Sequence, residues 1–221
     1  MSDGLVFIHS SDFQLGMTRW FLNEEAQSRF DDSRLRAITR LGDLAVKTGA
    51  EFIVVAGDVF DANALSERTM GRALDAIDAL PVPVYLLPGN HDPLVPGAAM
   101  EKADERANIA VLRDSTPVEH RPGVEIVGAP LLARYASEDL ASKAIAGLEP
   151  TSSIRILVAH GQTEGRSGDE SEVLLSLPKM ERALKDGVID YVALGGYPLR
   201  RSRRLQRPDL VLWFAGDHEL S

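Results

Sequence analysis

The chain has 221 residues, 44% of them hydrophobic and 26% charged, which are ordinary proportions for a soluble globular protein. This length fits one α/β domain with a sizeable buried core. The net charge of −9 disfavours indiscriminate binding to nucleic acid, and the absence of cysteine excludes disulfides, thiolate metal sites and cysteine nucleophiles. No apolar run approaches the roughly 20 residues of a membrane span, and the N-terminus lacks the basic segment of a signal peptide. We therefore expect a cytoplasmic protein without membrane contact.

Short apolar runs typical of buried strands alternate along the chain with amphipathic stretches typical of helices. We expect strands at residues 5–9, 52–56, 84–87, 109–112, 124–127, 154–159, 191–194 and 210–214. Helices are expected at 29–48, 66–80, 98–107, 137–146 and 174–185. The alternation predicts a mainly parallel sheet with helices outside it. The polar segment 165–171 is expected to form a mobile loop.

Residues of the types that bind metal ions follow four of the expected strands. Asp12 follows the first strand, Asp58 the second, Asn90 and His91 the third, and His160 a later one. In parallel sheets, ligands collect in the crevice beyond the carboxyl ends of the strands, so these side chains should converge. Carboxylate, amide and imidazole ligands together suit manganese, iron, zinc or nickel better than calcium or magnesium.

Such a set is suited to phosphoester hydrolysis. Two cations roughly 4 Å apart need a bridging carboxylate, clamp a phosphoryl group and generate hydroxide from water. Asp58 is the candidate bridge, Asn90 completes a site without adding charge, and His91 is placed to protonate a departing alkoxide as general acid. Asp92 has two interpretations, orientation of the His91 imidazole or capping of the next segment, and we favour the cap.

Each of these residues alone also has a purely structural explanation. An aspartate after a strand is commonly a cap or turn residue, and glycine with asparagine or aspartate is ordinary turn chemistry. A single histidine at a strand end, such as His160, is commonly a packing residue. The functional prediction therefore depends on the agreement of four strand ends in one order.

The ordered motifs D-x-Q, GDVFD, GNHD and AHG resemble those of the calcineurin-like metallophosphoesterase family, whose pattern is D-x-H, GDxxD, GNH(D/E), GH and a final GHxH. Within that family, HSSDFQLG, VVAGDVFD and LLPGNHD are most similar to SbcD-type DNA repair exonucleases. The resemblance covers about residues 9–216. It implies one metallophosphoesterase domain, 1–221, folded as a four-layer α/β/β/α sandwich of two mixed sheets, in place of the single sheet that the alternation predicts.

The resemblance also implies roles for single residues. Asp12 matches a ligand of the first metal and Asp58 the bridging ligand, while Asn90 and His160 match ligands of the second metal. His91 matches the catalytic acid. One or two divalent ions are implied, with manganese as the first choice and iron, zinc or nickel as alternatives.

Three positions depart from the family pattern. Gln14 stands where the family has the histidine of D-x-H. Segment 193–198 aligns with the final GHxH, so Gly196 and Pro198 stand where two histidines belong. The first metal therefore loses two imidazoles and the second loses one, and three remaining protein ligands can still form a catalytic site. A one-metal protein is the simplest interpretation, with His218 as an alternative ligand that is more simply explained as a chain-end residue.

Three functions remain open. The leading prediction is a phosphodiesterase, exonuclease-like, acting on DNA or nucleotides. The second is a pseudoenzyme that binds a partner or nucleic acid, for which the arginine-rich segment 200–207 is a candidate surface, although a solvated loop or hairpin is the more common explanation of such a charge run. The third is a small-molecule phosphomonoesterase. SbcD-type nucleases continue beyond the last strand into a region that grips DNA and couples to an ATPase, so we expect the chain to lack that region, and an ATPase partner is only implied.

Overall fold

The computed structural model describes residues 5–163, 174–196 and 211–214, the last range by its backbone alone. The strands of the first half are β1 (Val6–Ser10), β2 (Ile53–Ala56), β3 (Val84–Leu87) and β4 (Ile109–Val111), and its helices are α1 (Glu24–Thr48), α2 (Glu67–Asp78) and α3 (Ala99–Asp104). The second half contains β5 (Val118–Arg121), β6 (Val124–Ala129), β7 (Ile154–His160), β8 (Gln162–Thr163), β9 (Leu174–Leu175), β10 (Tyr191–Gly195) and β11 (Val211–Phe214), with helices α4 (Leu140–Ala146) and α5 (Leu177–Lys185).

The strands form two main sheets. The first has the order β11-β1-β2-β3-β4, and each of its pairings is parallel. The second has the order β10-β7-β6-β5, in which β10, β7 and β6 are parallel and β5 runs antiparallel to β6. Strands β8 and β9 pair separately in a short parallel ladder.

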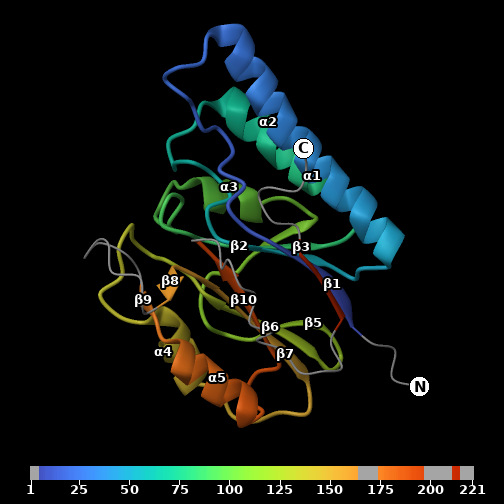
Figure 1. Ribbon diagram of the computed structural model, residues 1–221, viewed down its shortest axis with the longest axis vertical. Coiled ribbons are helices and arrows are strands. Elements are labelled where there is room, and N and C mark those ends of the chain that lie inside the picture. The colour runs from blue at the N-terminus through green and yellow to red at the C-terminus, as the bar shows by residue number, and fades with distance from the viewer. Residues whose placement is uncertain (1–4, 164–173, 197–210, 215–221) are drawn as a thin grey trace.

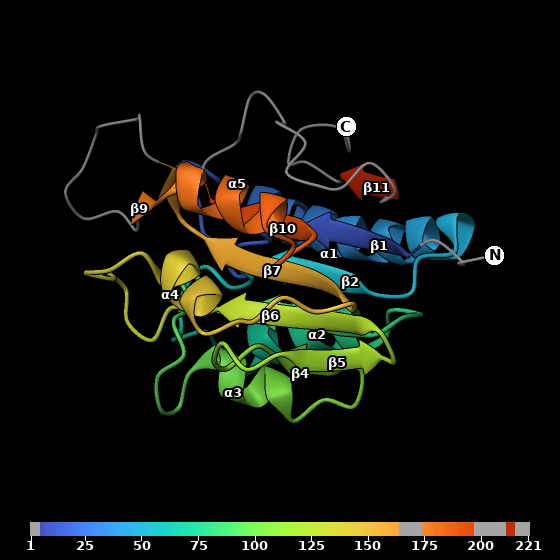
Figure 2. The same cartoon turned by 90° about the horizontal axis from the view of Figure 1, so that it is seen from below.

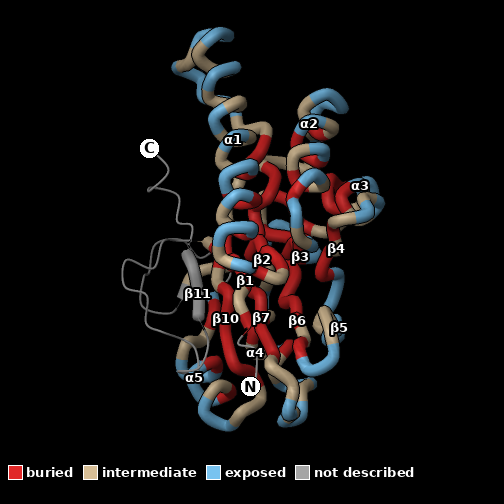
Figure 3. The backbone as a smooth tube through the Cα atoms, turned by 90° about the vertical axis from the view of Figure 1, so that its right-hand side faces the viewer, coloured by how far each residue is buried: buried red, intermediate tan, exposed pale blue. Residues whose placement is uncertain are grey.

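Helices cover the outer face of each sheet, and the two inner faces pack on each other (Figure 1, Figure 2). Helices α1, α2 and α3 contribute to one apolar cluster with the first sheet, and α4 and α5 contribute to another with the second. The third cluster lies between the sheets, where the rings of Phe7 and Phe52 stack at 5.1 Å. The expected four-layer α/β/β/α sandwich is therefore confirmed, and Figure 3 shows the buried strands at its centre.

Helix α1 is much longer than its buried face. Asn23 caps its N-terminus by accepting a hydrogen bond from the Ala26 N–H at 2.8 Å, and Gly49 ends it in the left-handed conformation. The buried positions of α1, among them Ile38 and Leu41, lie in its second half. The first half therefore projects beyond the sheet and is covered on fewer sides (Figure 3).

The structure differs from the predicted elements in several places; helix α1, for example, begins at Glu24 and not at residue 29. The single predicted sheet is two sheets, because strands buried on both faces are equally typical of either arrangement. Strand β5 was not predicted, since its sequence VEHR is largely polar and exposed. The expected helix 174–185 begins only at Leu177, after β9, because Pro178 is suited to the first turn of a helix. None of the helices in the described part of the chain combines the length and the apolarity needed to cross a membrane.

Candidate metal centre

Four of the predicted ligands lie together at the carboxyl ends of β1, β2, β3 and β7. Atom Nε2 of His160 is 2.9 Å from Oδ1 of Asn90 and 3.4 Å from Oδ2 of Asp58. One ligand atom from each of Asp12, Asp58 and His160 lies within 4.8 Å of the others. Asp12, Asp58 and Asn90 follow strands of the first sheet and His160 ends a strand of the second, so the cluster joins the two halves of the sandwich.

The backbone around this cluster is tight and partly strained. Asp12 and Asp58 have φ of 56° and 53°, a left-handed conformation that non-glycine residues rarely adopt. Such outliers persist where surrounding structure holds them, and they are frequent at functional sites. A Cβ placed on Gly89 would lie 2.2 Å from Asp58 Oδ1, and one on Gly57 would lie 2.2 Å from His160 Nδ1. Only glycine therefore lets these loops approach the two ligands.

The orientation of His160 leaves one nitrogen for a ligand. Its Nδ1 lies 2.8 Å from the carbonyl oxygen of Ala56, and because a carbonyl only accepts, Nδ1 carries the proton and donates it. Nε2 therefore points toward Asp58 and Asn90. A carbonyl behind one imidazole nitrogen is the usual support for metal binding by the other.

The charges of the cluster also match a cation. Burial alone would lower the pKa of His160, but its hydrogen bond to Asp58 and the charges of Asp58 and Asp12 outweigh this and raise the pKa to about 9. Burial raises the pKa of Asp12. Burial alone would raise the pKa of Asp58, but His160 and the His91 N–H stabilise its carboxylate, and its pKa is lowered overall. A proton on His160 thus balances buried negative charge that a divalent ion would balance instead. The donor set fits such an ion.

His91 lies beside the cluster and is held by two contacts. Its backbone N–H donates to Asp58 Oδ1 at 3.0 Å, and its ring Nδ1 donates to the carbonyl oxygen of Asp61 at 3.0 Å. The Asp61 carboxylate lies 3.9 Å from the same nitrogen. The ring is about one-third exposed, so Nε2 is the atom available to a substrate. This role of Asp61 was not predicted from the sequence, although Asp61 is the second aspartate of GDVFD.

Asp92 has neither of the roles considered from the sequence. Its carboxylate is fully buried and accepts hydrogen bonds from the N–H groups of Gly89 at 2.8 Å and Phe60 at 2.9 Å. Burial raises its pKa to about 6. The predicted cap of the following segment is therefore replaced by a link between two loops, those that follow β2 and β3.

At the first-metal positions the structure shows backbone donors. The N–H of Gly196 donates to Asp12 Oδ2 at 3.1 Å, and the N–H of Gln14 donates to the carbonyl oxygen of Asp58 at 2.9 Å. Gly196 therefore lies against Asp12, where an imidazole was expected from the family pattern. Pro198, His218, the arginine-rich segment 200–207 and the loop 165–171 lie outside the described residues.

The two-sheet sandwich with carboxylate, amide and imidazole groups at one end is the architecture of metallophosphoesterases. The family model of the calcineurin-like phosphoesterases matches residues 5–218, and the chain belongs to that family. The predicted family is thus confirmed, and with it a hydrolase fold whose members depend on divalent metal ions.

Two curated relatives resemble the chain over part of their length. The DNA double-strand break repair protein Mre11 of Saccharolobus solfataricus is 27% identical over 162 residues, which are 69% of this chain and 40% of that protein. The uncharacterized metallophosphoesterase YhaO of Bacillus subtilis is 25% identical over 223 aligned residues, which cover 96% of this chain and 53% of that protein. The chain thus spans about half the length of these relatives or less.

Among solved structures, TT1561 of Thermus thermophilus has a similar fold. The TM-score is 0.53 at 13% sequence identity, and the match covers 87% of this chain and 81% of the other. At that identity the likeness concerns the fold alone.

Proposed function

We propose that this protein is a divalent-metal-dependent phosphodiester hydrolase whose main ion is held by Asp58, Asn90 and His160. The observation that supports this most is the approach of His160 Nε2 to Asn90 Oδ1 and Asp58 Oδ2, at 2.9 and 3.4 Å. Three protein ligands leave coordination positions for water and substrate, which is typical of catalytic sites. Manganese is the first choice of ion, and iron, zinc and nickel suit the same donors.

The metal ion and the nearby side chains would have separate roles in the reaction. A divalent ion at this position would polarise the phosphoryl group and lower the pKa of a bound water. His91, held by Asp61, donates a proton from Nε2 to the leaving alkoxide, which is why we favour a diester over a monoester as substrate. Asp12 supplies a further carboxylate, which binds a second ion only weakly because one of its oxygens already accepts a hydrogen bond from the Gly196 N–H.

The proposed substrate class is nucleic acid or nucleotides. It is supported by the similarity to Mre11, which is described as a DNA double-strand break repair protein. Since the chain spans only 40% of that relative, an ATPase partner remains a prediction drawn from the resemblance.

The alternative is a protein of this fold that binds nucleic acid or a partner without turnover. The hydrogen bond from Gly196 N–H to Asp12 Oδ2 favours it, because a donor at that oxygen competes with a cation. It differs from the main proposal in predicting binding that survives chelation.

Hydrolysis of bis(4-nitrophenyl) phosphate with added manganese tests the main proposal. We expect turnover in the wild type and a loss of at least about 100-fold in Asp58→Asn, which removes the negative charge of a ligand, and in His160→Ala, which removes a ligand. Asp139→Asn, at the N-cap of α4, is a matched control that alters a carboxylate away from the centre. Equal rates in the wild type and the two ligand variants would contradict the proposal.

A further inference from the structure

The connection between β1 and α1 exposes two large aromatic side chains side by side. Trp20 is 94% exposed and Phe21 is 63% exposed, and their rings meet edge to face at 5.7 Å. We call this pair the aromatic tip. Burying such rings is strongly favourable, so two neighbouring rings that are both largely exposed mark a surface that another molecule covers.

The aromatic tip stands on a braced segment. The side chain of Gln27 in α1 accepts a hydrogen bond from the Arg19 N–H at 3.0 Å and donates to the Met17 carbonyl at 2.9 Å. The Leu22 N–H closes a turn onto the Arg19 carbonyl at 3.0 Å. The two rings are therefore presented at low cost in conformational entropy, as binding surfaces require.

The segment that carries the tip begins at the metal centre. Trp20 is six positions after Gln14, so its backbone lies at most about 22 Å from the Gln14 backbone at full extension. A helically stacked strand spans that distance in about six nucleotides. Leu15, between the two, bridges to Phe60 in the loop that follows Asp58. The tip and the centre thus belong to one continuous piece of structure.

Two arginines lie over one aromatic ring close to the tip in the sequence. The guanidinium groups of Arg19 and Arg34 lie over the ring of Phe30 at 6.0 and 4.8 Å. Proteins that bind single-stranded nucleic acid by stacking on its bases combine exposed aromatic rings with nearby arginines. Nearby carboxylates, including Glu24 and Asp31, keep the region from being strongly basic. Base stacking, rather than attraction for phosphate, should therefore dominate there.

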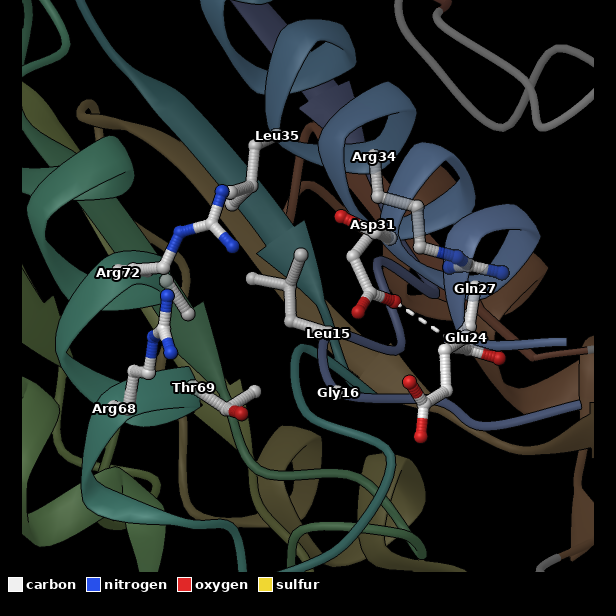
Figure 4. A pocket seen from close by; sticks show the side chains of 12 residues that line it. Leu15, Gly16, Glu24, Gln27, Asp31, Arg34, Leu35, Arg68, Thr69 and Arg72 are labelled. Carbon is white, nitrogen blue, oxygen red and sulfur yellow. Dashed lines mark hydrogen bonds between the residues drawn. The ribbon is translucent and has the colours of Figure 1, made fainter.

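A cavity of about 370 Å³ lies between α1 and α2, next to the same segment (Figure 4). Leu15 and Gly16 line it, and α2 contributes Arg68 and Arg72 to one wall. Arg72 pairs with Asp32 at 2.7 Å, whereas Arg68 has no carboxylate at ion-pair distance among the described residues. The Arg68 guanidinium is thus available to a phosphate of a strand that crosses the cavity.

We propose that the aromatic tip stacks the bases of single-stranded nucleic acid and, together with the Arg68 wall of the cavity, directs the strand to the metal centre. This proposal depends on the proposed function and specifies single-stranded nucleic acid as the substrate. A duplex would bind more weakly, because its bases are stacked on one another and only the terminal pair exposes a face to side chains.

Fluorescence titration tests the binding. The chain has two tryptophans, so Trp213→Phe leaves Trp20 as the only indole reporter. A thymidine oligonucleotide of about 12 nucleotides, added in the presence of chelator to prevent cleavage, should quench it saturably. A second assay with a labelled oligonucleotide should show at least about 10-fold weaker binding for Trp20→Ala with Phe21→Ala, and a smaller loss for Arg68→Gln. Tyr135→Ala, at another exposed aromatic residue, is the matched control.

The outcomes separate this surface from the proposed function. Hydrolysis of bis(4-nitrophenyl) phosphate should be unchanged in the Trp20→Ala, Phe21→Ala variant, while KM for single-stranded DNA rises. If the wild type does not hydrolyse the small diester, the proposed function is wrong. Oligonucleotide binding can still be measured in that case, so the two proposals can fail separately. Unchanged affinity in the double variant would overturn the proposal, as would equal quenching by a duplex. A further result would overturn the proposal: no quenching by the oligonucleotide, together with weaker self-association or weaker protein binding in the double variant. That result would identify the aromatic tip as a protein interface.

Discussion

The backbone N–H of Gly196 donates a hydrogen bond to Oδ2 of Asp12 at 3.1 Å, across the ends of β10 and β1. An N–H group neutralises only part of the charge on a carboxylate, whereas an imidazole in that place would help to hold a cation. The site therefore has two unequal halves. Asp58, Asn90 and His160 offer three side-chain ligands for an ion, whereas Asp12 and Gln14 offer fewer and weaker ones.

Metal stoichiometry follows from this division. We expect one tightly bound divalent ion per wild-type chain by elemental analysis after gel filtration, and loss of that ion in His160→Ala. Restoring imidazoles with Gln14→His and Pro198→His together should raise the content toward two. Two ions in the wild type, or an unchanged content in the double variant, would show that the first-metal positions are assigned incorrectly.

Substitution of His91 should depend on the leaving group. His91→Gln removes the proposed proton donor but keeps the backbone N–H that contacts Asp58. For an alkoxide leaving group we expect a loss of about 10²–10⁴-fold in kcat, because the departing oxygen needs the proton. A nitrophenolate leaves without one, so its diester should lose much less. Equal losses for both esters would exclude His91 as the acid.

Substitution of Gly89 should damage both the site and the fold. A Cβ at this position meets Asp58 Oδ1 at 2.2 Å and the Asp58 backbone nitrogen at 2.4 Å, so backbone must move. We expect Gly89→Ala to cost about 1–3 kcal/mol of unfolding free energy and to abolish metal binding. Gly71→Ala in α2 is the matched control, since a Cβ there meets nothing within 4 Å and alanine favours a helix. Similar stability of both variants would contradict the predicted clash.

Acid stability should depend on His9 in the core between the sheets. Its Nδ1 lies 2.9 Å from the Tyr191 hydroxyl, and burial lowers its pKa to about 4, opposed only by the Leu194 carbonyl. A histidine that resists protonation in the folded state contributes stability above its unfolded pKa of about 6.5. That contribution falls by up to about 1.4 kcal/mol per pH unit as the pH drops from 6.5 toward 4.

Urea unfolding at pH 7 and pH 5 measures this dependence. His9→Asn should be less stable than the wild type at pH 7 and should lose less stability between the two values. Equal losses in both proteins would mean that other groups govern the acid transition. Tyr191→Phe, which removes only the hydroxyl partner, serves as the comparison.

The sequence predicted the strands that position the site better than it predicted their assembly. Runs such as FIVVA, in β2, are continuous and fully buried, so their ends could be located from composition. Whether β7 joined the same sheet as β2 could not be read from such runs, because both arrangements bury them. Only the family resemblance predicted two sheets.

Local hydrogen bonding was the least predictable part of the site. The convergence of Asp58, Asn90 and His160 was predicted and is observed, while their role as metal ligands stays a prediction. The link made by Asp92 depends on the N–H of Phe60, which is far away in sequence and close only after folding. No feature of the sequence predicted the aromatic tip. Trp20 and Phe21 look like ordinary apolar residues until their exposure in the structure is known.

The proposed ligands come from both sheets, and this links catalysis to the packing of the whole sandwich. Asp58 and Asn90 follow strands of the first sheet, and His160 ends a strand of the second. An ion shared between them would act as a cross-link, so its binding energy would oppose any sliding of one sheet over the other. Conversely, substitutions among the rings between the sheets, such as Phe52, would be felt as changes in metal affinity at a distance from the site.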